Sequence, residues 1–359
     1  MRNKERIIPF SATHVGSIIK DELEFLDLTQ VQLAEQTGIA KTVLNELLKG
    51  KRGLNAEMAV KISEVINIPD ELLMKIQSKY EIDCVRIRLR DEADVQANEE
   101  LKKYSEKINF NLLFRKLEID TTHLSYALDR LCELLNVNNI GEVPLAPAFS
   151  RSMKSGLDYR QLTTWTILAR CNANKVSVNG LFSLEDEEKI KSELASIFNE
   201  NVDTENRTKE VLTKYGIKYC VEPKLEKASV NGCSFMSNGI PAIVVTKRIN
   251  TIDNFAFTIM HELCHVYNHL SDGCEPKINF DDYSDDALET EANTYAQNAL
   301  IDKALWAYAP AVKMIVPDIQ REYTGWANAN HIHKWIVLGR ISREIGIYSF
   351  KKDPSRNLT

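Results

Sequence analysis

Two histidines and a glutamate in one short segment have the types and spacing of a metal-dependent hydrolase. The segment is His261-Glu262-Leu263-Cys264-His265. On a helix, residues four apart lie on one face, about 6 Å apart, so both imidazoles can bind one metal ion. Glu262 follows the first histidine and can reach a water molecule on that metal. Two nitrogen ligands, an open coordination position and a carboxylate base suit a zinc hydrolase, so we expect Zn2+.

The flanking residues predict that this segment is a buried helix. Residues 254–266 contain no Pro or Gly, and they carry recurring apolar side chains at Phe255, Phe257, Ile259, Met260, Leu263 and Val266. An ordinary amphipathic helix with two histidines is the alternative. His269 continues the spacing, but on a straight helix it lies about 12 Å from His261, too far to share its metal.

A third ligand is needed, and the next predicted helix, residues 288–301, offers Glu289 and Glu291. These two carboxylates are about 200° apart around the helix axis. Glu289 lies on the more apolar face, whereas Glu291 lies on a more polar one. Because a buried carboxylate needs a partner such as a metal, we favour Glu289 over Glu291. Asn293, one turn further on, can orient a ligating histidine.

The N-terminal 80 residues predict a series of short helices, at 16–27, 30–36, 41–48, 56–66 and 70–80. Thr29 is suited to cap the second of these, and Gly38 to make the tight turn into the third. Two short helices joined through a glycine turn indicate a helix-turn-helix.

In such a motif the helix at 41–48 enters the major groove of DNA. Lys41, Thr42 and Asn45 could then reach base edges. Four further polar or basic residues would lie near phosphates: Gln30, Lys49, Lys51 and Arg52. Residues 1–80 hold 11 Lys+Arg and 11 Asp+Glu, so the domain is neutral. This weak charge indicates binding to an operator as a homodimer, or a domain that binds protein instead.

The rest of the chain divides into a helical region and a mixed one. Residues 81–180 begin with a charge run and continue with helical periodicities, without visible chemistry, so we expect a helical connector. In residues 181–359, strands are predicted at 217–221, 233–236 and 242–246 among helices. The fold class expected is mostly α, with an all-α domain at 1–80 and an α+β zincin-like domain at 181–359.

The composition is that of an ordinary soluble protein. Of the 359 residues, 44% are hydrophobic and 27% are charged, both average shares. No window approaches 18 consecutive apolar residues, so we expect no transmembrane helix and no membrane partner. The seven cysteines are odd in number and scattered, which favours reduced thiols and a cytoplasmic protein.

Two of these regions resemble known families. The run Phe257-Thr258-x-x-His261-Glu262-x-x-His265, with Glu289 and Asn293 downstream, resembles the ImmA/IrrE family of zinc metallopeptidases. The resemblance implies zinc ligands at both histidines of the run and at Glu289, and a catalytic glutamate at Glu262. Cys264 stands where that family commonly has a glycine. Residues 28–52 resemble the Xre/Cro class, and residues 14–59 resemble HigA-type antitoxins more narrowly.

Together these resemblances imply a DNA-binding regulator fused to a zinc metalloendopeptidase. Its expected partners are a DNA operator and a protein, either a substrate such as a repressor or a toxin. The alternative is a transcriptional repressor or toxin–antitoxin antitoxin whose zinc domain senses or binds a partner without proteolysis. Intact His261, Glu262, His265 and Glu289 favour the enzyme, and the HigA-like start favours the regulator.

Overall fold

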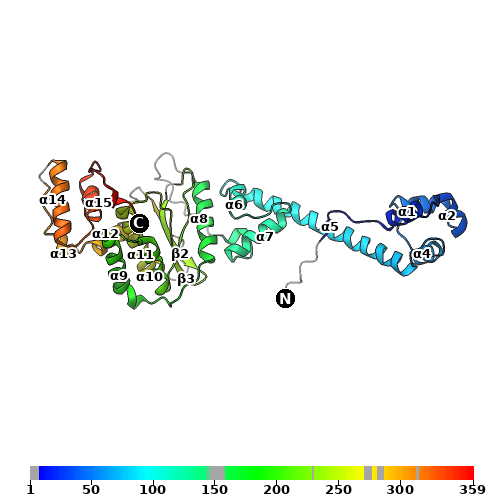
Figure 1. The fold of residues 1–359 in the computed structure, drawn as a ribbon, viewed down its shortest axis with the longest axis horizontal. Coiled ribbons are helices and arrows are strands. Elements are labelled where there is room, and N and C mark those ends of the chain that lie inside the picture. The colour runs from blue at the N-terminus through cyan, green and yellow to red at the C-terminus, as the bar shows by residue number, and fades with distance from the viewer. Residues whose placement is uncertain are drawn as a thin grey trace. The chain divides into compact units, whose positions relative to one another are not determined.

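The computed structural model describes residues 8–143, 145, 158–228, 230–270, 277–280, 287–312 and 315–359. The chain divides into two compact units, Met1–Glu100 and Leu101–Thr359, which are taken in turn (Figure 1). Cys274 and the aspartates between residues 281 and 286, noted in the sequence, lie outside the described residues.

The first unit is all helical. Its helices are α1 (Val15–Phe25), α2 (Gln30–Thr37), α3 (Lys41–Leu48), α4 (Ala56–Ser63) and the first part of α5 (Asp70–Tyr104). Their inward faces form one small core, with fully buried side chains that include Ile19, Leu33, Leu44, Ile62 and Leu73. The all-α prediction for this region is confirmed.

Local signals fix the turn between α2 and α3. The Thr29 hydroxyl accepts a hydrogen bond from the Gln32 N–H, and the Gln32 side chain accepts one from the Thr29 N–H, which completes a capping box. Gly38 ends α2 with a φ of 66°, a left-handed conformation that glycine adopts without strain. The turn therefore follows from residues that the sequence displays.

Helix α5 extends well beyond residue 80, where a helix end was expected. No Pro or Gly interrupts residues 70–104. Ion pairs between residues one turn apart, such as Lys79–Asp83 at 2.8 Å, stabilise the helix. The charge run at the start of residues 81–180 is thus helical. The boundaries at 80 and 180 stay predictions.

The second unit is built on a four-stranded sheet. Its strands are β1 (Lys218–Val221), β2 (Val230–Ser237), β3 (Ile240–Val245) and β4 (Lys277–Phe280), in the order β1-β3-β2-β4. β1 is parallel to β3, and β2 is antiparallel to both of its neighbours. Three of these strands were expected from the sequence, and β4 was not.

Helices cover both faces of the sheet. Successive side chains of β3 point to opposite faces and therefore belong to two different cores. Ala242 and Val244 pack with α6 (Phe110–Lys116), α7 (Leu124–Leu135) and α8 (Tyr159–Asn174). Ile243 and Val245 pack on the opposite face, against a core shared by α9 (Glu187–Glu200), α10 (Thr204–Lys214), α11 (Ile252–Cys264), α12 (Ala287–Leu300), α14 (Val316–Ala329) and α15 (Lys334–Ile345). The remaining short helices are α13 (Lys303–Trp306), η1 (Ile140–Glu142), η3 (Leu184–Asp186) and η5 (Pro354–Arg356). The predicted α+β class is confirmed for this unit.

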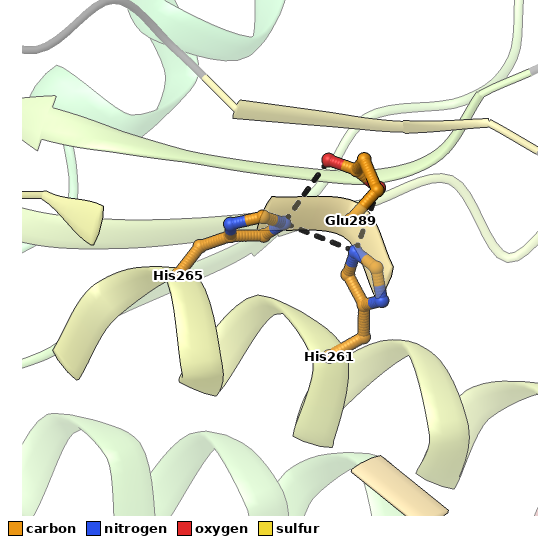
Figure 2. A group of neighbouring side chains, drawn as sticks. All are labelled: His261, His265 and Glu289. Atoms are coloured by element: carbon orange, nitrogen blue, oxygen red, sulfur yellow. Dashed lines mark hydrogen bonds and ion pairs between the residues drawn. The ribbon is translucent and has the colours of Figure 1, made fainter. Parts of the chain in front are cut away.

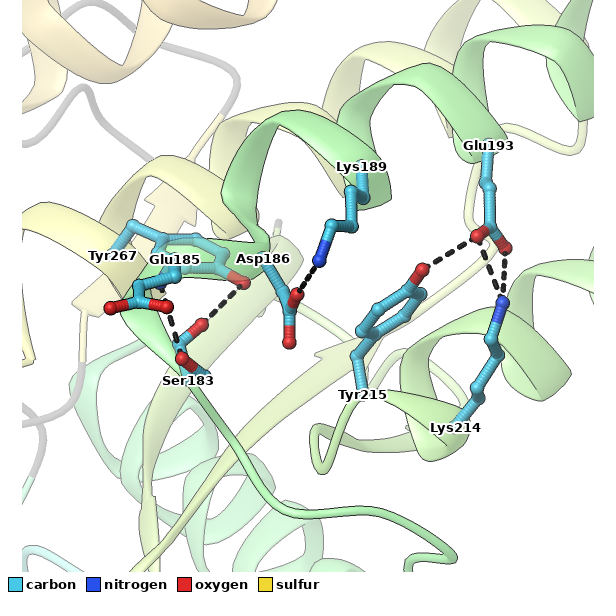
Figure 3. A network of polar contacts seen from close by, with 8 residues as sticks. All are labelled: Ser183, Glu185, Asp186, Lys189, Glu193, Lys214, Tyr215 and Tyr267. Carbon is cyan, nitrogen blue, oxygen red and sulfur yellow. Dashed lines mark hydrogen bonds and ion pairs between the residues drawn. The ribbon is translucent and has the colours of Figure 1, made fainter.

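Polar contacts join α9 to the end of α10 (Figure 3). Lys214 Nζ lies 2.8 Å from Glu193 Oε1, and the Tyr215 hydroxyl donates to the same oxygen at 2.6 Å. The pKa of Glu193 is lowered most by the hydrogen bond from Lys214 and next by the hydrogen bond from Tyr215. These contacts fix α9 and α10 relative to each other on their side of the sheet.

The segment after α15 folds back onto the start of α11. Arg356 makes a two-pronged ion pair with Asp253, at 2.7 and 3.1 Å, and Asn357 bridges to Thr251. The Thr204 N–H donates to the Thr359 carbonyl at 2.7 Å. Residues that are last in the sequence therefore become part of the wall around α11.

No helix in the described part of the chain is long and apolar enough to cross a membrane.

Candidate metal centre and helix-turn-helix

Helix α11 carries the histidine–glutamate motif through the centre of the second unit. Its apolar residues belong to the core, and His261, Glu262 and His265 are at most 1% exposed. The α-helix ends at Cys264, and a π-helical turn follows at His265–His269. Such wider turns are frequent at functional sites.

The two histidines and Glu289 of α12 converge on one point (Figure 2). His261 Nε2 and His265 Nε2 are 3.1 Å apart, and they lie 3.2 and 3.3 Å from the two carboxylate oxygens of Glu289. Donors bound tetrahedrally at about 2.05 Å from a zinc ion are about 3.3 Å apart. Although the two histidines contact different oxygens of Glu289, the separations in this triangle of side chains are close to those that a zinc ion requires.

Hydrogen bonds on the far side of each ring aim the Nε2 lone pairs at this point. Asn293 Oδ1 lies 3.1 Å from His261 Nδ1, and because a carbonyl oxygen only accepts, the histidine carries its proton on Nδ1. His265 Nδ1 lies 2.7 Å from His269 Nδ1. His269 Nε2 lies 3.4 Å from Glu291 Oε2 without a well-directed hydrogen bond, and this carboxylate favours a proton on that nitrogen. His269 Nδ1 can then accept from His265.

The charges at this point also call for a cation. Burial lowers the pKa of His265 below its usual value, so this imidazole is neutral at pH 7. Glu289 is partly buried, and although burial opposes it, contacts with His261 and His265 hold its pKa at about 2 when these rings carry protons on Nε2. With the ring protons on Nδ1, this stabilisation is lost and the carboxylate lacks a compensating charge. A bound metal would supply it.

Glu291 lies apart from this triangle, on the other side of α12. Its side chain is 52% exposed, and it accepts a hydrogen bond from Asn268 Nδ2 at 3.1 Å. It forms a second cluster with Cys264 and His269. Of the two carboxylates weighed in the sequence, Glu289 is the one beside both motif histidines.

Glu262 is buried against the sheet without a well-formed hydrogen bond to either oxygen in the described part of the chain. Burial raises its pKa well above the usual value, the nearby Ser234 hydroxyl opposes this shift, and the charge of Glu289 adds to it. Gly232 of β2 makes the space for this side chain. A Cβ there would lie 3.0 Å from Glu262 Oε1.

His331 and His333 do not belong to a cluster of possible metal ligands in the described part of the chain. His333 caps α15, since its Nδ1 accepts from the Trp335 N–H at 3.3 Å. His331 precedes it in a turn with a φ of 57°. On a straight helix His269 would lie too far from His261 to share its metal. The π-helical turn instead brings His269 against His265. No role was predicted for Gly232 from the sequence, and only the fold shows that it lies against Glu262.

In the first unit, the residues predicted to contact DNA lie on α3 and around it. Lys41 and Thr42 are exposed, and Asn45 is partly exposed, while Leu44 and Leu47 of the same helix face the core. Gln30 is the first residue of α2, and Lys49, Lys51 and Arg52 follow α3 at the surface. Their accessibility is compatible with the predicted roles.

Two of these cations have acidic neighbours. Arg52 Nε lies 2.9 Å from Glu46 Oε2, and Lys41 Nζ lies 3.5 Å from Glu35 Oε1. Ion pairs between exposed side chains are weak, so DNA phosphates could displace these carboxylates. The pairs nevertheless reduce the positive potential of the surface.

Comparisons with known proteins agree with this division. Residues 19–73 match the helix-turn-helix family model, and residues 213–320 match the IrrE N-terminal-like domain of peptidase family M78. Virulence-associated protein A' of Dichelobacter nodosus is 31% identical over 83 residues, which are 23% of this chain and 72% of that protein.

Two further proteins are similar to part of the chain. The uncharacterized HTH-type transcriptional regulator YddM of Escherichia coli K12 is 31% identical over 67 residues, which are 19% of this chain and 71% of that protein. An addiction module antidote protein of the HigA family from Coxiella burnetii is 24% identical and covers 26% of this chain and 95% of its own, with a TM-score of 0.20. The chain therefore belongs to the helix-turn-helix family through its N-terminal unit and carries an IrrE-like domain of peptidase family M78 in its second unit.

Proposed function

We propose that the second unit is a zinc metalloendopeptidase and that it cleaves a regulatory protein at specific sites. The observation that carries this proposal is the convergence of His261, His265 and Glu289 beside a buried, hydrogen-bond-poor Glu262. The first three would hold the zinc ion. When bound, zinc supplies a water of near-neutral pKa and polarises the scissile carbonyl.

The chain's own residues have separate tasks in this reaction. Asn293 and His269 hold the two rings so that each Nε2 presents its lone pair. Glu262 accepts the proton of the attacking water on a carboxylate oxygen and passes it to the leaving amine. Because burial raises the pKa of Glu262, its carboxylate is a stronger base than that of an exposed glutamate.

A direct test combines metal analysis with a cleavage assay. The purified chain should retain about one zinc per molecule after dialysis, and it should cut one of the proteins encoded beside it at a defined bond. A chain that retains no metal at any stage would refute the metal centre. A zinc-loaded chain that cuts none of these proteins would favour the alternative, a regulator whose zinc domain senses or binds a partner.

We further propose that the first unit binds an operator as a homodimer. The accessible row Lys41, Thr42 and Asn45 on α3 supports base contacts, and the neutral charge of residues 1–80 argues against tight binding by a single copy. A mobility-shift titration should show preference for the DNA upstream of the gene and two copies per site. Equal binding to scrambled DNA would instead make this unit a protein-docking module, with a toxin as one possible partner.

A further inference from the structure

A cavity of about 490 Å³ adjoins the candidate metal centre. Glu289 and Asn293 form part of its lining, whereas His261, Glu262 and His265 do not, so the cavity lies beside the candidate metal site. Its other walls come from the start of α11, from α15 and from the segment that folds back after α15. A space of this size and place suits side chains next to a scissile bond.

Cations predominate in the lining of this cavity. It contains five basic residues, Arg248, Arg340, Arg343, Lys352 and Arg356, and two carboxylates, Asp253 and Glu289. Asp253 is paired with Arg356, and Glu289 is turned towards the histidines. The chain as a whole has a net charge of −6. The positive lining is thus a local feature and not a consequence of composition.

Arg343 stacks on an aromatic ring that lies next to one of the candidate metal ligands. Its guanidinium carbon lies 3.5 Å from the centre of the Phe257 ring, and that ring lies 6.1 Å from the His261 ring, one helical turn along α11. Stacking uses the flat face of a guanidinium, whereas its hydrogen bonds leave along the edge, so the stack fixes the orientation of the N–H groups. Only one aromatic ring separates this cation from His261.

A second cation approaches from the sheet. Arg248 donates to Asn231 Oδ1 at 3.2 Å, and Asn231 precedes Gly232, whose backbone lies against Glu262. Arg248 and Arg343 therefore line the same cavity from different elements. A carboxylate bound in the cavity could meet both guanidinium groups, and charge-assisted hydrogen bonds of this kind are strong.

We propose that this cavity binds a carboxylate of the peptide substrate, and specifically an Asp or Glu side chain within one or two residues of the scissile bond. The inference rests on the proposed peptidase function and adds its sequence preference. An extended peptide advances about 3.3 Å per residue, so a side chain at this separation can reach Arg343 while the scissile carbonyl lies at the histidines. The C-terminal carboxylate of a peptide has the same chemistry, and the test separates the two sources.

Isothermal titration calorimetry on the full, zinc-loaded chain can test this with four matched probes. Each is a short peptide hydroxamate, which binds a catalytic zinc ion through the hydroxamate group. The probes differ only in Glu or Gln beside that group and in a C-terminal amide or free carboxylate. We expect the Glu amide to bind about tenfold more tightly than the Gln amide, the difference that one charge-assisted hydrogen bond provides.

Variants then locate the preference. Arg343→Gln should reduce the Glu/Gln ratio of affinities towards one, Arg343→Lys should retain part of it, and Arg321→Gln should leave it unchanged. Arg321 is the matched control, because it is an arginine on α14 with 70% of its side chain exposed and it does not line the cavity. Circular dichroism checks that each variant folds. For the unmodified chain, the ratio should also fall at high salt.

The outcomes are distinct. Equal affinities of the Glu and Gln amides for the unmodified chain overturn the proposal. A preference carried by the free C-terminal carboxylate instead of by Glu also overturns it, in favour of an exopeptidase. If no probe binds the zinc-loaded chain, the metal is closed to substrate, and the proposed peptidase function is refuted together with this inference. If all probes bind alike, the metal centre stands and only the acidic preference is lost.

Discussion

The two units place their proposed functional residues in opposite environments. On α3, Lys41 and Thr42 are exposed and Leu44 faces the core, so the residues expected to act are separate from those that hold the fold. On α11, His261 and Glu262 are themselves part of the interior. A substitution on α3 should therefore alter recognition with little effect on stability, whereas a substitution on α11 affects packing and chemistry together.

The buried position of Glu262 has an energetic cost. A buried polar group without hydrogen-bond partners costs about 1–3 kcal/mol in folding free energy. Such a group is expected at a site that is shaped for a reaction more than for stability. The first unit contains Gln77 Oε1 as a comparable unpartnered atom, but there the oxygen belongs to a neutral amide.

The largest effect should come from Glu262→Gln. The amide has nearly the same shape but cannot accept a proton, so hydrolysis of a cleavable partner should fall about 10³-fold or more while zinc content stays the same. Because the amide removes a buried ionisable group, the melting temperature should not decrease. Rates and metal content are measured on the same preparation. Cleavage at a comparable rate by this variant would show that Glu262 is not the base.

Glu289→Ala should remove the metal. Loss of a direct ligand should weaken zinc binding by more than the 10- to 100-fold that is typical of an outer-shell change. Glu291→Ala is the control, since Glu291 contacts Asn268 and His269 and not the motif histidines. Zinc content is measured after dialysis of both variants. Retention by Glu289→Ala together with loss by Glu291→Ala would reverse the assignment.

Gly232→Ala tests the space behind Glu262. The added Cβ would lie 3.0 Å from Glu262 Oε1 and 2.9 Å from Thr258 Cγ2, so the glutamate must shift. Misplacement of a catalytic group by about 1 Å can cost about 10²-fold in rate. Zinc content should stay the same, because the ligands come from α11 and α12. Gly325→Ala on α14 is the matched control, since nothing lies within 4 Å of its Cβ. Unchanged hydrolysis by Gly232→Ala would mean that Glu262 need not occupy this position.

In the first unit, Asn45→Ala should cost about 1–3 kcal/mol in binding to the specific operator and little on random DNA. Lys51→Ala should weaken both by a similar, smaller amount and flatten the salt dependence, since it is expected to contact phosphate. Mobility-shift titrations on specific and scrambled duplexes separate the two. Neither variant should alter the melting temperature, because both side chains are accessible. An unfolded Asn45→Ala variant would contradict the contrast between the units.

Local signals explain what could be predicted. The bounds of α3 match the expected helix at 41–48, and β1, β2 and β3 overlap the three strands that were expected, the first of them from its alternation. The positions of His261 and His265 on one helical face follow from their spacing alone. Asn293 was expected beside a motif histidine because it lies one turn from Glu289, and it lies 3.1 Å from His261.

Features that depend on tertiary contacts were not predictable. β4 has only four residues, Lys277–Phe280, and it exists through pairing with β2. The π-helical turn after Cys264 has no recognised sequence signature, yet it brings His269 to His265. The basic cavity assembles residues from Arg248 to Arg356, and no short window contains enough of them to show the cluster.

The segment after α15 has a consequence for how the protein is made. Phe350, Lys352 and Arg356 line the cavity beside the candidate metal centre, and Arg356 holds the start of α11 through Asp253. Ribosomes synthesise these residues after the helix-turn-helix, the sheet and both ligand-bearing helices. A nascent chain can thus fold its DNA-binding unit well before its cavity has a complete wall. If the second unit is a peptidase, as we propose, its cavity is completed only after the first unit can fold.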